Sequence, residues 1–168
     1  MLRALAVAAV ELRAAGGIPP DAIIDVIGDH RPDLAAQFDP TLIQFRGRVA
    51  DLNELAGAGV FLAPVTSGSG VKLKVLDGMA LGCPVVATPL GCEGLSARPN
   101  RDLLVAADVV GVLRAAIALR ERPALKAMLA RRAQSYLRRA HASSLGDVVT
   151  DAIARAIAAR ASAPQETL

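Results

Sequence analysis

The feature that most constrains the fold is an alternation of short apolar runs with longer segments of helical periodicity. Five runs, each four to six residues long, occupy residues 23–28, 42–45, 59–64, 84–88 and 102–106. Short runs of this kind, closed by glycine, proline or polar residues, are typical of strands buried on both faces. Strands that alternate with helices predict βαβ units, so we expect an α/β fold with a doubly wound, Rossmann-like parallel sheet.

Helical patterns fill the stretches between these runs. The opening segment repeats Leu2, Leu5, Ala9 and Leu12 at helical spacing and ends at Gly16-Gly17. Charged residues interrupt its apolar run, so an amphipathic helix fits it better than a signal peptide. Further helices are predicted over 33–38 and over 71–81, the latter ending before Gly82. Asp51 and Glu54 resemble a capping box, which predicts a short helix that runs through Ala56. Three more helices are predicted within 109–160.

The 168 residues predict one domain with two short additions at its C-terminal side. We expect a Rossmann-like domain over residues 1–140, a further helix over 141–160 and a disordered tail over 161–168. A doubly wound domain normally opens with a strand, whereas this sequence opens with a helix. The expectation is therefore that the first strand is missing and that the domain is truncated at its N-terminus.

Composition excludes several classes of function. The chain is 53% hydrophobic but has only three Phe, one Tyr and no Trp, too few rings for stacking on single-stranded nucleic acid, so no nucleic-acid partner is expected. Cys83 and Cys92 lack partners at metal-ligand spacing, and His30 and His141 lie far apart in the sequence. We therefore expect free thiols in a reducing compartment, no metal site and a cytoplasmic protein.

The basic residues are concentrated toward the C-terminal third, although the formal net charge is only +3. The cluster comprises Arg120, Arg122, Lys126, Arg131, Arg132, Arg138 and Arg139. This distribution is compatible with a phosphate-bearing partner or with peripheral contact at the anionic inner face of a membrane. A solvated helix face is the alternative interpretation.

The stretch from Pro64 to Leu95 has the strongest chemical signal. A strand ends at Pro64, and the loop after it contains Gly68 and Gly70, which have no Cβ to obstruct a ligand. A helix predicted to begin near Val71 would point free backbone N–H groups and its positive dipole end into that loop. Such a site at the carboxyl end of a parallel strand suits a phosphate group.

Two charged side chains on the following helix extend this hypothesis. Lys72 and Lys74 lie two residues apart and cannot share a helix face, so at most one faces the ligand, and we favour Lys74. Asp77 stands about two turns into the helix, where a carboxylate can accept hydrogen bonds from vicinal ribose hydroxyls. The loop matches neither the Walker A nor the dinucleotide pattern. A simple tight turn followed by a solvated aspartate is the alternative.

The order of these segments resembles the C-terminal domain of glycosyltransferase family 4, also called glycosyl transferases group 1. The resemblance extends from about Ile23 to Leu137. It rests on FRGRVADLNEL, GVFLAP, GSGVKLKVLDGMALGCPVVATPLGCEGL and DLLVA. It implies one half of a GT-B fold, in which two Rossmann-like domains face a cleft and a sugar is transferred, usually with retention, from a nucleotide-diphosphate donor.

The resemblance also implies a set of donor-binding residues. Backbone N–H groups of Gly68, Ser69, Gly70 and Val71 would hold the donor's sugar and diphosphate. Asp77 would hold the ribose, Lys74 the diphosphate, and the Arg48-Val49 turn would pack against the nucleobase. Neither a metal nor a cofactor is implied, since the nucleotide sugar is a substrate. No catalytic residue can be assigned.

The sequence departs from the family pattern at two acidic positions. Many members carry two glutamates eight residues apart, where this chain has Ser69 and Asp77. The N-terminal domain that supplies the acceptor site is also missing, which predicts a donor-binding half that acts with another domain or partner chain. A non-catalytic binding or partner module is the alternative. A weaker one is an epimerase of the same architecture, which the lack of a His-and-carboxylate set disfavours.

Overall fold

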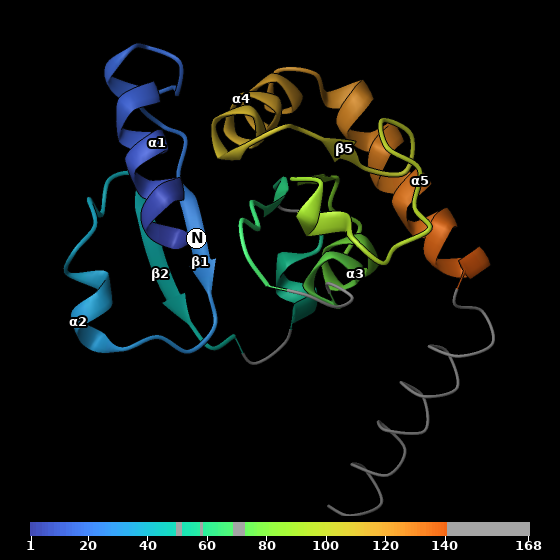
Figure 1. Ribbon diagram of the computed structural model, residues 1–168, viewed down its shortest axis with the longest axis horizontal. Coiled ribbons are helices and arrows are strands. Elements are labelled where there is room, and N and C mark those ends of the chain that lie inside the picture. The colour runs from blue at the N-terminus through green and yellow to red at the C-terminus, as the bar shows by residue number, and fades with distance from the viewer. Residues whose placement is uncertain (50–51, 58, 69–72, 141–168) are drawn as a thin grey trace, which may run out of the picture.

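The computed structural model describes residues 1–49, 52–57, 59–68 and 73–140. Helices and strands alternate along most of this length, as the sequence pattern predicts (Figure 1). The elements are α1 (Leu2–Ala14), β1 (Ile24–Ile27), α2 (Pro32–Ala35), β2 (Ile43–Gly47), η1 (Leu52–Leu55), β3 (Phe61–Ala63), α3 (Leu73–Ala80), β4 (Val85–Ala87), η2 (Leu90–Cys92), β5 (Leu104–Val105), α4 (Val109–Arg120) and α5 (Pro123–Ala140).

All strand pairs are parallel, which confirms the α/β class, but the strands form two sheets. One has the order β1-β2 and the other β3-β4-β5. Among the described residues no strand of one sheet pairs with a strand of the other. The single continuous sheet expected from the sequence is therefore divided into these two parts.

Two helical layers hold the sheets together. On one side, α1 packs against α4, and their shared core includes Leu5, Leu12 and Leu113 with Leu42 and Ile43 of the β2 region. Leu62 of β3 also packs on this cluster, so α1 and α4 bridge both sheets through one apolar layer. In a second cluster α3 and α5 pack together against β3 and β4 (Figure 1). β4, which has a neighbour on each side, is wholly buried.

Where the structure describes them, the predicted strands and most of the predicted helices are confirmed in type; most are shorter than expected, whereas β2 extends to Gly47. The strand expected over 102–106 is reduced to Leu104–Val105, and the helix expected over 33–38 to Pro32–Ala35. The short helix predicted after Asp51 is a 3₁₀ helix. Asp51 itself, the helix predicted over 141–160 and the tail predicted over 161–168 lie outside the described residues. Both cysteines are free thiols, Cys83 buried and Cys92 half-buried. None of the described helices is long and apolar enough to span a bilayer.

Close packing at Gly78 sets the position of α3 on β3. A Cβ atom added at Gly78 would lie 2.5 Å from Cγ of Phe61, far inside van der Waals contact. The ring of Phe61 therefore occupies the space that a side chain at position 78 would need. Because the predicted ligand loop connects β3 to α3, this contact also fixes where that loop must end.

We expect Gly78→Ala to destabilise the chain by about 1–2 kcal/mol. Overpacking a core typically costs 1–3 kcal/mol, which exceeds the gain of up to about 1 kcal/mol from the helix propensity of alanine. Thermal or urea unfolding measures the difference. Gly59→Ala is the matched control, because a Cβ there meets no heavy atom within 4 Å. Equal stability of the two variants would contradict the packing argument.

Candidate functional site

The predicted site residues follow the carboxyl ends of parallel strands. Arg48 and Val49 come directly after β2, and Gly68 belongs to the loop after β3. Thr88, which was not among the predicted residues, follows β4 in the same way. Open α/β sheets bind ligands at this edge because the connections diverge there and leave backbone groups free. The fold therefore places the predicted donor-binding segments where the architecture allows a ligand.

Thr88 ties the loop after β3 to the turn after β4. Its side chain is 4% exposed, and its Oγ1 donates a hydrogen bond to the carbonyl oxygen of Val65 at 2.6 Å. The same oxygen accepts from the backbone N–H of Gly91 at 3.2 Å. A buried hydroxyl with a donor and an acceptor partner is fully satisfied and resists displacement. It thus fixes the start of the loop that leads to Gly68.

The exposed face of α3 carries both of its predicted ligand residues. Val75, Leu76 and Met79 are buried against the core, whereas Lys74 and Asp77 are exposed. Three residues apart on a helix, Lys74 and Asp77 project from the same side. The structure therefore presents one cation and one carboxylate together on the exposed face of the helix that follows the β3 loop. Leu73, 66% exposed, adds an apolar group beside them.

The loop itself is described only in part. Gly68 is exposed and has φ +105°, a backbone conformation that residues other than glycine rarely adopt. A Cβ atom added to Gly68 would meet no heavy atom within 4 Å. This agrees with the predicted open, glycine-dependent loop. Ser69, Gly70 and Val71 lie outside the described residues, and their proposed contacts stay predictions.

A second group of polar residues lies at the carboxyl ends of β1 and β2. Arg48 is exposed and its Nη2 forms an ion pair with Oδ2 of Asp29 at 2.6 Å, while Val49 is half-buried. His30 stacks at a tilt on Phe45, with ring centroids 4.7 Å apart. Within the described part of the chain, no hydrogen bond or ion pair joins Arg48 to Lys74 or Asp77. Each group follows the carboxyl end of a parallel strand.

Sequence reasoning missed Asp29 and Thr88 as parts of this edge. Asp29 follows the glycine that closes the first apolar run, and Thr88 is the last residue of the fourth. Asp29 is the first polar residue after a predicted parallel strand and Thr88 is the polar residue that ends one, which was a usable signal.

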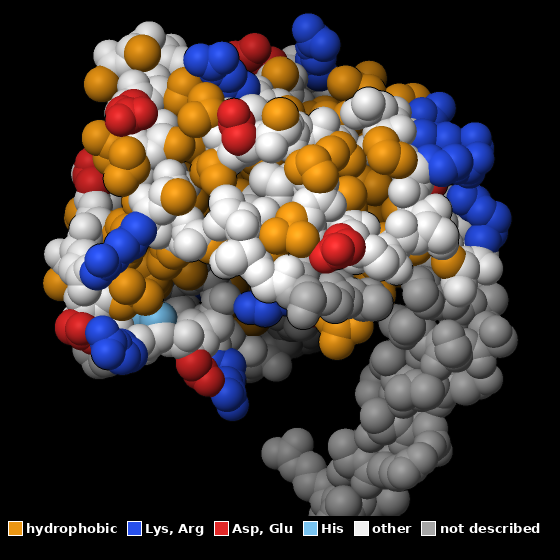
Figure 2. Space-filling model, in the orientation of Figure 1, with side chains coloured by type: hydrophobic (Ala, Val, Ile, Leu, Met, Phe, Trp, Pro, Cys, Tyr) orange, Lys and Arg blue, Asp and Glu red, His pale blue; other side chains and the backbone are white. Residues whose placement is uncertain are grey.

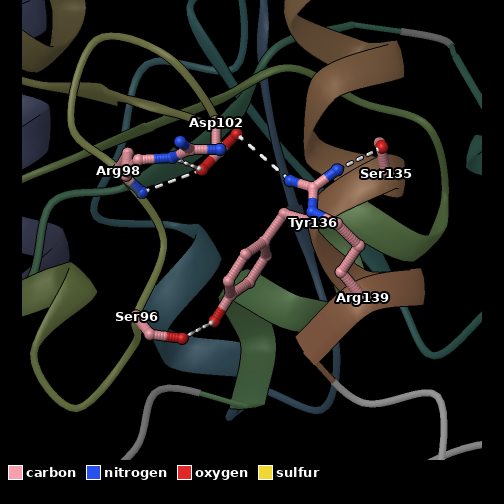
Figure 3. Close-up of polar contacts among 6 residues, drawn as sticks. All are labelled: Ser96, Arg98, Asp102, Ser135, Tyr136 and Arg139. Carbon is pink, nitrogen blue, oxygen red and sulfur yellow. Dashed lines mark hydrogen bonds and ion pairs between the residues drawn. The ribbon is translucent and has the colours of Figure 1, made fainter.

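A buried ion pair secures the segment that leads into β5. Asp102 is 2% exposed, and its Oδ2 accepts from the backbone N–H of Arg98 at 3.0 Å and from Arg98 Nε at 3.3 Å. Nη2 of Arg139, on α5, lies 4.0 Å from the other carboxylate oxygen (Figure 3). Nearby, the hydroxyls of Tyr136 and Ser96 are 3.4 Å apart. The cluster joins the loop after β4 to α5.

The environment of Asp102 favours its ionised form. Burial raises the pKa of the carboxyl, but the hydrogen bonds from Arg98 and the charges of Arg98 and Arg101 outweigh burial. The pKa of Asp102 therefore lies below its usual value of 3.8. Since the group is ionised at neutral pH and fully partnered, its role is to hold the loop in place.

Apart from the residues at the strand ends, the described part of the chain offers another candidate for a site, a hollow beside α1. In the described ranges no three His, Cys, Asp or Glu side chains gather as metal ligands. A shallow, mainly apolar hollow of about 460 Å³ lies between α1 and residues 37–43, with Val7 and Val10 in its wall. None of the predicted donor-binding residues lines it, and the chemistry at the strand ends gives a better candidate than this hollow.

Comparison with known proteins points to one family. The model of the family described as glycosyl transferases group 1 matches residues 2–122. A curated protein of Klebsiella pneumoniae, described as an uncharacterized 44.6 kDa protein in the cps region, is 29% identical over 101 residues. That match covers 54% of this chain and 26% of the Klebsiella protein.

The fold is similar to that of solved HepE structures from Anabaena. The HepE complex with UDP superposes with a TM-score of 0.67 at 16% identity, over 89% of this chain and 44% of HepE. The HepE complex with UDP-glucose gives 0.64 at 17% identity, over 79% and 40%. The chain thus spans less than half the length of these relatives.

Asp102→Asn should lower stability at neutral pH by about 1–3 kcal/mol, since hydrogen bonds to a charged group contribute about that much. The pKa of Asp102 is lower in the folded chain than in the unfolded chain, so its ionisation stabilises the fold at pH values above the unfolded-state pKa. This stabilisation is lost as the pH falls through the folded-state pKa. The difference between wild type and variant should therefore shrink below about pH 4. Thermal unfolding from pH 3 to 7 measures it.

The control for this series is Asp33→Asn, which removes an exposed ion pair with Arg31. We expect a change within about 0.5 kcal/mol for the control. A stability difference at Asp102 that stayed constant between pH 3 and 7 would show that the charge of this carboxylate does not matter.

Proposed function

Because this chain belongs to the glycosyl transferases group 1 family, we propose that it binds a nucleoside diphosphate sugar and takes part in transferring the sugar to an acceptor hydroxyl. The observation that carries the proposal is the exposed face of α3, the helix after the β3 loop, where Lys74 and Asp77 stand together. The HepE structures, whose complexes contain UDP or UDP-glucose, add support through the shared fold.

Each element of the β3–α3 segment has a distinct task in this proposal. The diphosphate lies against the loop that contains Gly68, Ser69, Gly70 and Val71, where backbone N–H groups and the positive end of α3 favour an anion. Lys74 adds a full positive charge. Asp77 accepts hydrogen bonds from two ribose hydroxyls, and its carboxylate must reach about one methylene further than glutamate would.

The chemistry requires stabilisation of the leaving nucleoside diphosphate. The bond between the anomeric carbon and the diphosphate oxygen breaks, and the acceptor oxygen forms a new bond to that carbon and loses its proton. Negative charge grows on the diphosphate as it leaves, so N–H donors and Lys74 stabilise the transition state more than the ground state. Net retention at the anomeric carbon is part of the proposal.

A second domain or a partner chain completes the active site in this account. The acceptor site and the group that takes the acceptor proton are assigned to that other half. One observation supports the division: the chain spans only 44% of HepE. Arg48 and Val49, at the end of β2, are proposed to face the nucleobase.

A non-catalytic partner module is a second candidate, and the unpaired inner edges of β1 and β3 favour it. Residues of these two strands are mostly half-buried, whereas β4 is wholly buried. Free edges of parallel strands are places where another chain can pair. A chain that is soluble only together with a partner, and that binds no nucleotide, would support this candidate.

The donor proposal predicts nucleotide-dependent stabilisation. We expect one of UDP, GDP or ADP, or its sugar conjugate, to raise the melting temperature of the purified chain. At about a hundredfold excess over Kd the gain is about 2.7 kcal/mol, or about 5–10 °C for a domain of this size. The shift should largely disappear in Asp77→Ala, because the ribose loses its acceptor.

Asp33→Ala serves as the control, since it removes an exposed helical aspartate far along the chain from the loop. It should keep the full nucleotide shift. Absence of any shift in the wild type, or an equal shift in Asp77→Ala, would contradict the proposed donor site.

A further inference from the structure

The charge of the molecule is divided unevenly between its elements. Residues 109–140, which form α4 and α5, contain eight Lys or Arg and one Glu, a net charge of +7. The whole chain has a net charge of +3, so all remaining residues together carry a net −4. The positive charge is thus a property of these two helices.

Four arginines of α5 occupy one side of that helix. Arg131, Arg132, Arg138 and Arg139, hereafter the arginine face, are spaced as two adjacent pairs seven residues apart. At about 100° per residue this spacing places all four within a sector of about 120°, with the pairs about 10 Å apart along the axis. The buried residues of α5, Leu129, Ala133 and Tyr136, point the other way.

The arginine face is open to solvent. All four side chains are exposed, and Figure 2 shows Lys and Arg side chains gathered at the edge of the molecule where α5 lies. Within the described residues Arg131, Arg132 and Arg138 form no ion pair, whereas Arg139 contacts Ser135 and approaches Asp102. Arg120 of α4 differs, because Asp21 neutralises it. Three unpaired guanidinium groups therefore remain available to an external anion.

We propose that the arginine face docks this protein on the surface of an anionic lipid bilayer. α5 carries no acidic residue, and the exposed Ala124 and Ala127, which precede the arginines along the helix, have short side chains. Such a surface is flat and bears spread positive charge, which complements the flat, spread negative charge of acidic headgroups. Guanidinium groups also bind phosphate oxygens in bidentate geometry.

The composition favours a membrane over a nucleic acid as the partner. Single-stranded nucleic acid is bound through aromatic stacking, and α4 and α5 contain only one ring, that of the buried Tyr136. The arginine face shares no residue with the proposed donor site. The proposal is therefore independent of the proposed function.

Sedimentation with vesicles tests this proposal directly. The full chain should bind phosphatidylcholine vesicles that contain about 30% phosphatidylglycerol, and should not bind pure phosphatidylcholine vesicles. The triple variant Arg131→Gln, Arg132→Gln, Arg138→Gln should bind about a hundredfold more weakly, because each arginine near an anionic surface contributes roughly fivefold. Raising the salt to about 0.5 M should also weaken wild-type binding.

The matched control removes the same charge elsewhere. The triple variant Arg3→Gln, Arg31→Gln, Arg46→Gln should keep vesicle binding within about threefold of wild type. Circular dichroism of both variants verifies that they are folded, and the chosen residues of α5 make no described ion pair that folding needs. Equal weakening of both variants, no binding by the wild type, or tighter binding to duplex DNA than to the anionic vesicles would overturn the proposal.

Discussion

The contact between Phe61 and Gly78 is the constraint on which the candidate site depends. The ring of Phe61 lies where a side chain at position 78 would be, so α3 can approach β3 closely only because residue 78 is glycine. That approach turns Lys74 and Asp77 outward and places the connecting loop at the carboxyl edge of the strands. Thr88 then fixes the start of the same loop through Val65. The site is thus positioned by core packing and one buried hydroxyl.

The charged residues of the molecule fall into three groups, one buried in the fold, one on α3 and one on the outer side of α5. The buried carboxylate of Asp102 contacts Arg98 and Arg139, and these contacts hold the loop before β5 against α5. Lys74 and Asp77 carry opposite charges at the solvent surface, as a ligand with phosphates and hydroxyls requires. The remaining arginines of α5 face outward. One helix therefore stabilises the fold through one of its arginines and presents the others to an external anion.

Much of the fold followed from the sequence because buried parallel strands leave a clear apolar pattern. The runs around Val26, Leu62 and Val86 are strands, and the helix with Asp77 has its predicted exposed face. The division into two sheets depends on pairing between distant strands, which local patterns do not encode. Likewise, the partners of Asp102 come from α5, far away in the sequence, so burial and pairing of that carboxylate could not be read from its neighbours.

The central claim is that a nucleoside diphosphate binds at the loop between β3 and α3. Titration of the isotope-labelled chain with UDP, followed by amide resonances in two-dimensional NMR, locates the ligand residue by residue. We predict that the largest saturable shifts fall on Gly68, Lys74 and Asp77 and their immediate neighbours. Shifts confined to the arginines of α5, or to the hollow beside Val7, would contradict the claim, as would no shift at millimolar UDP.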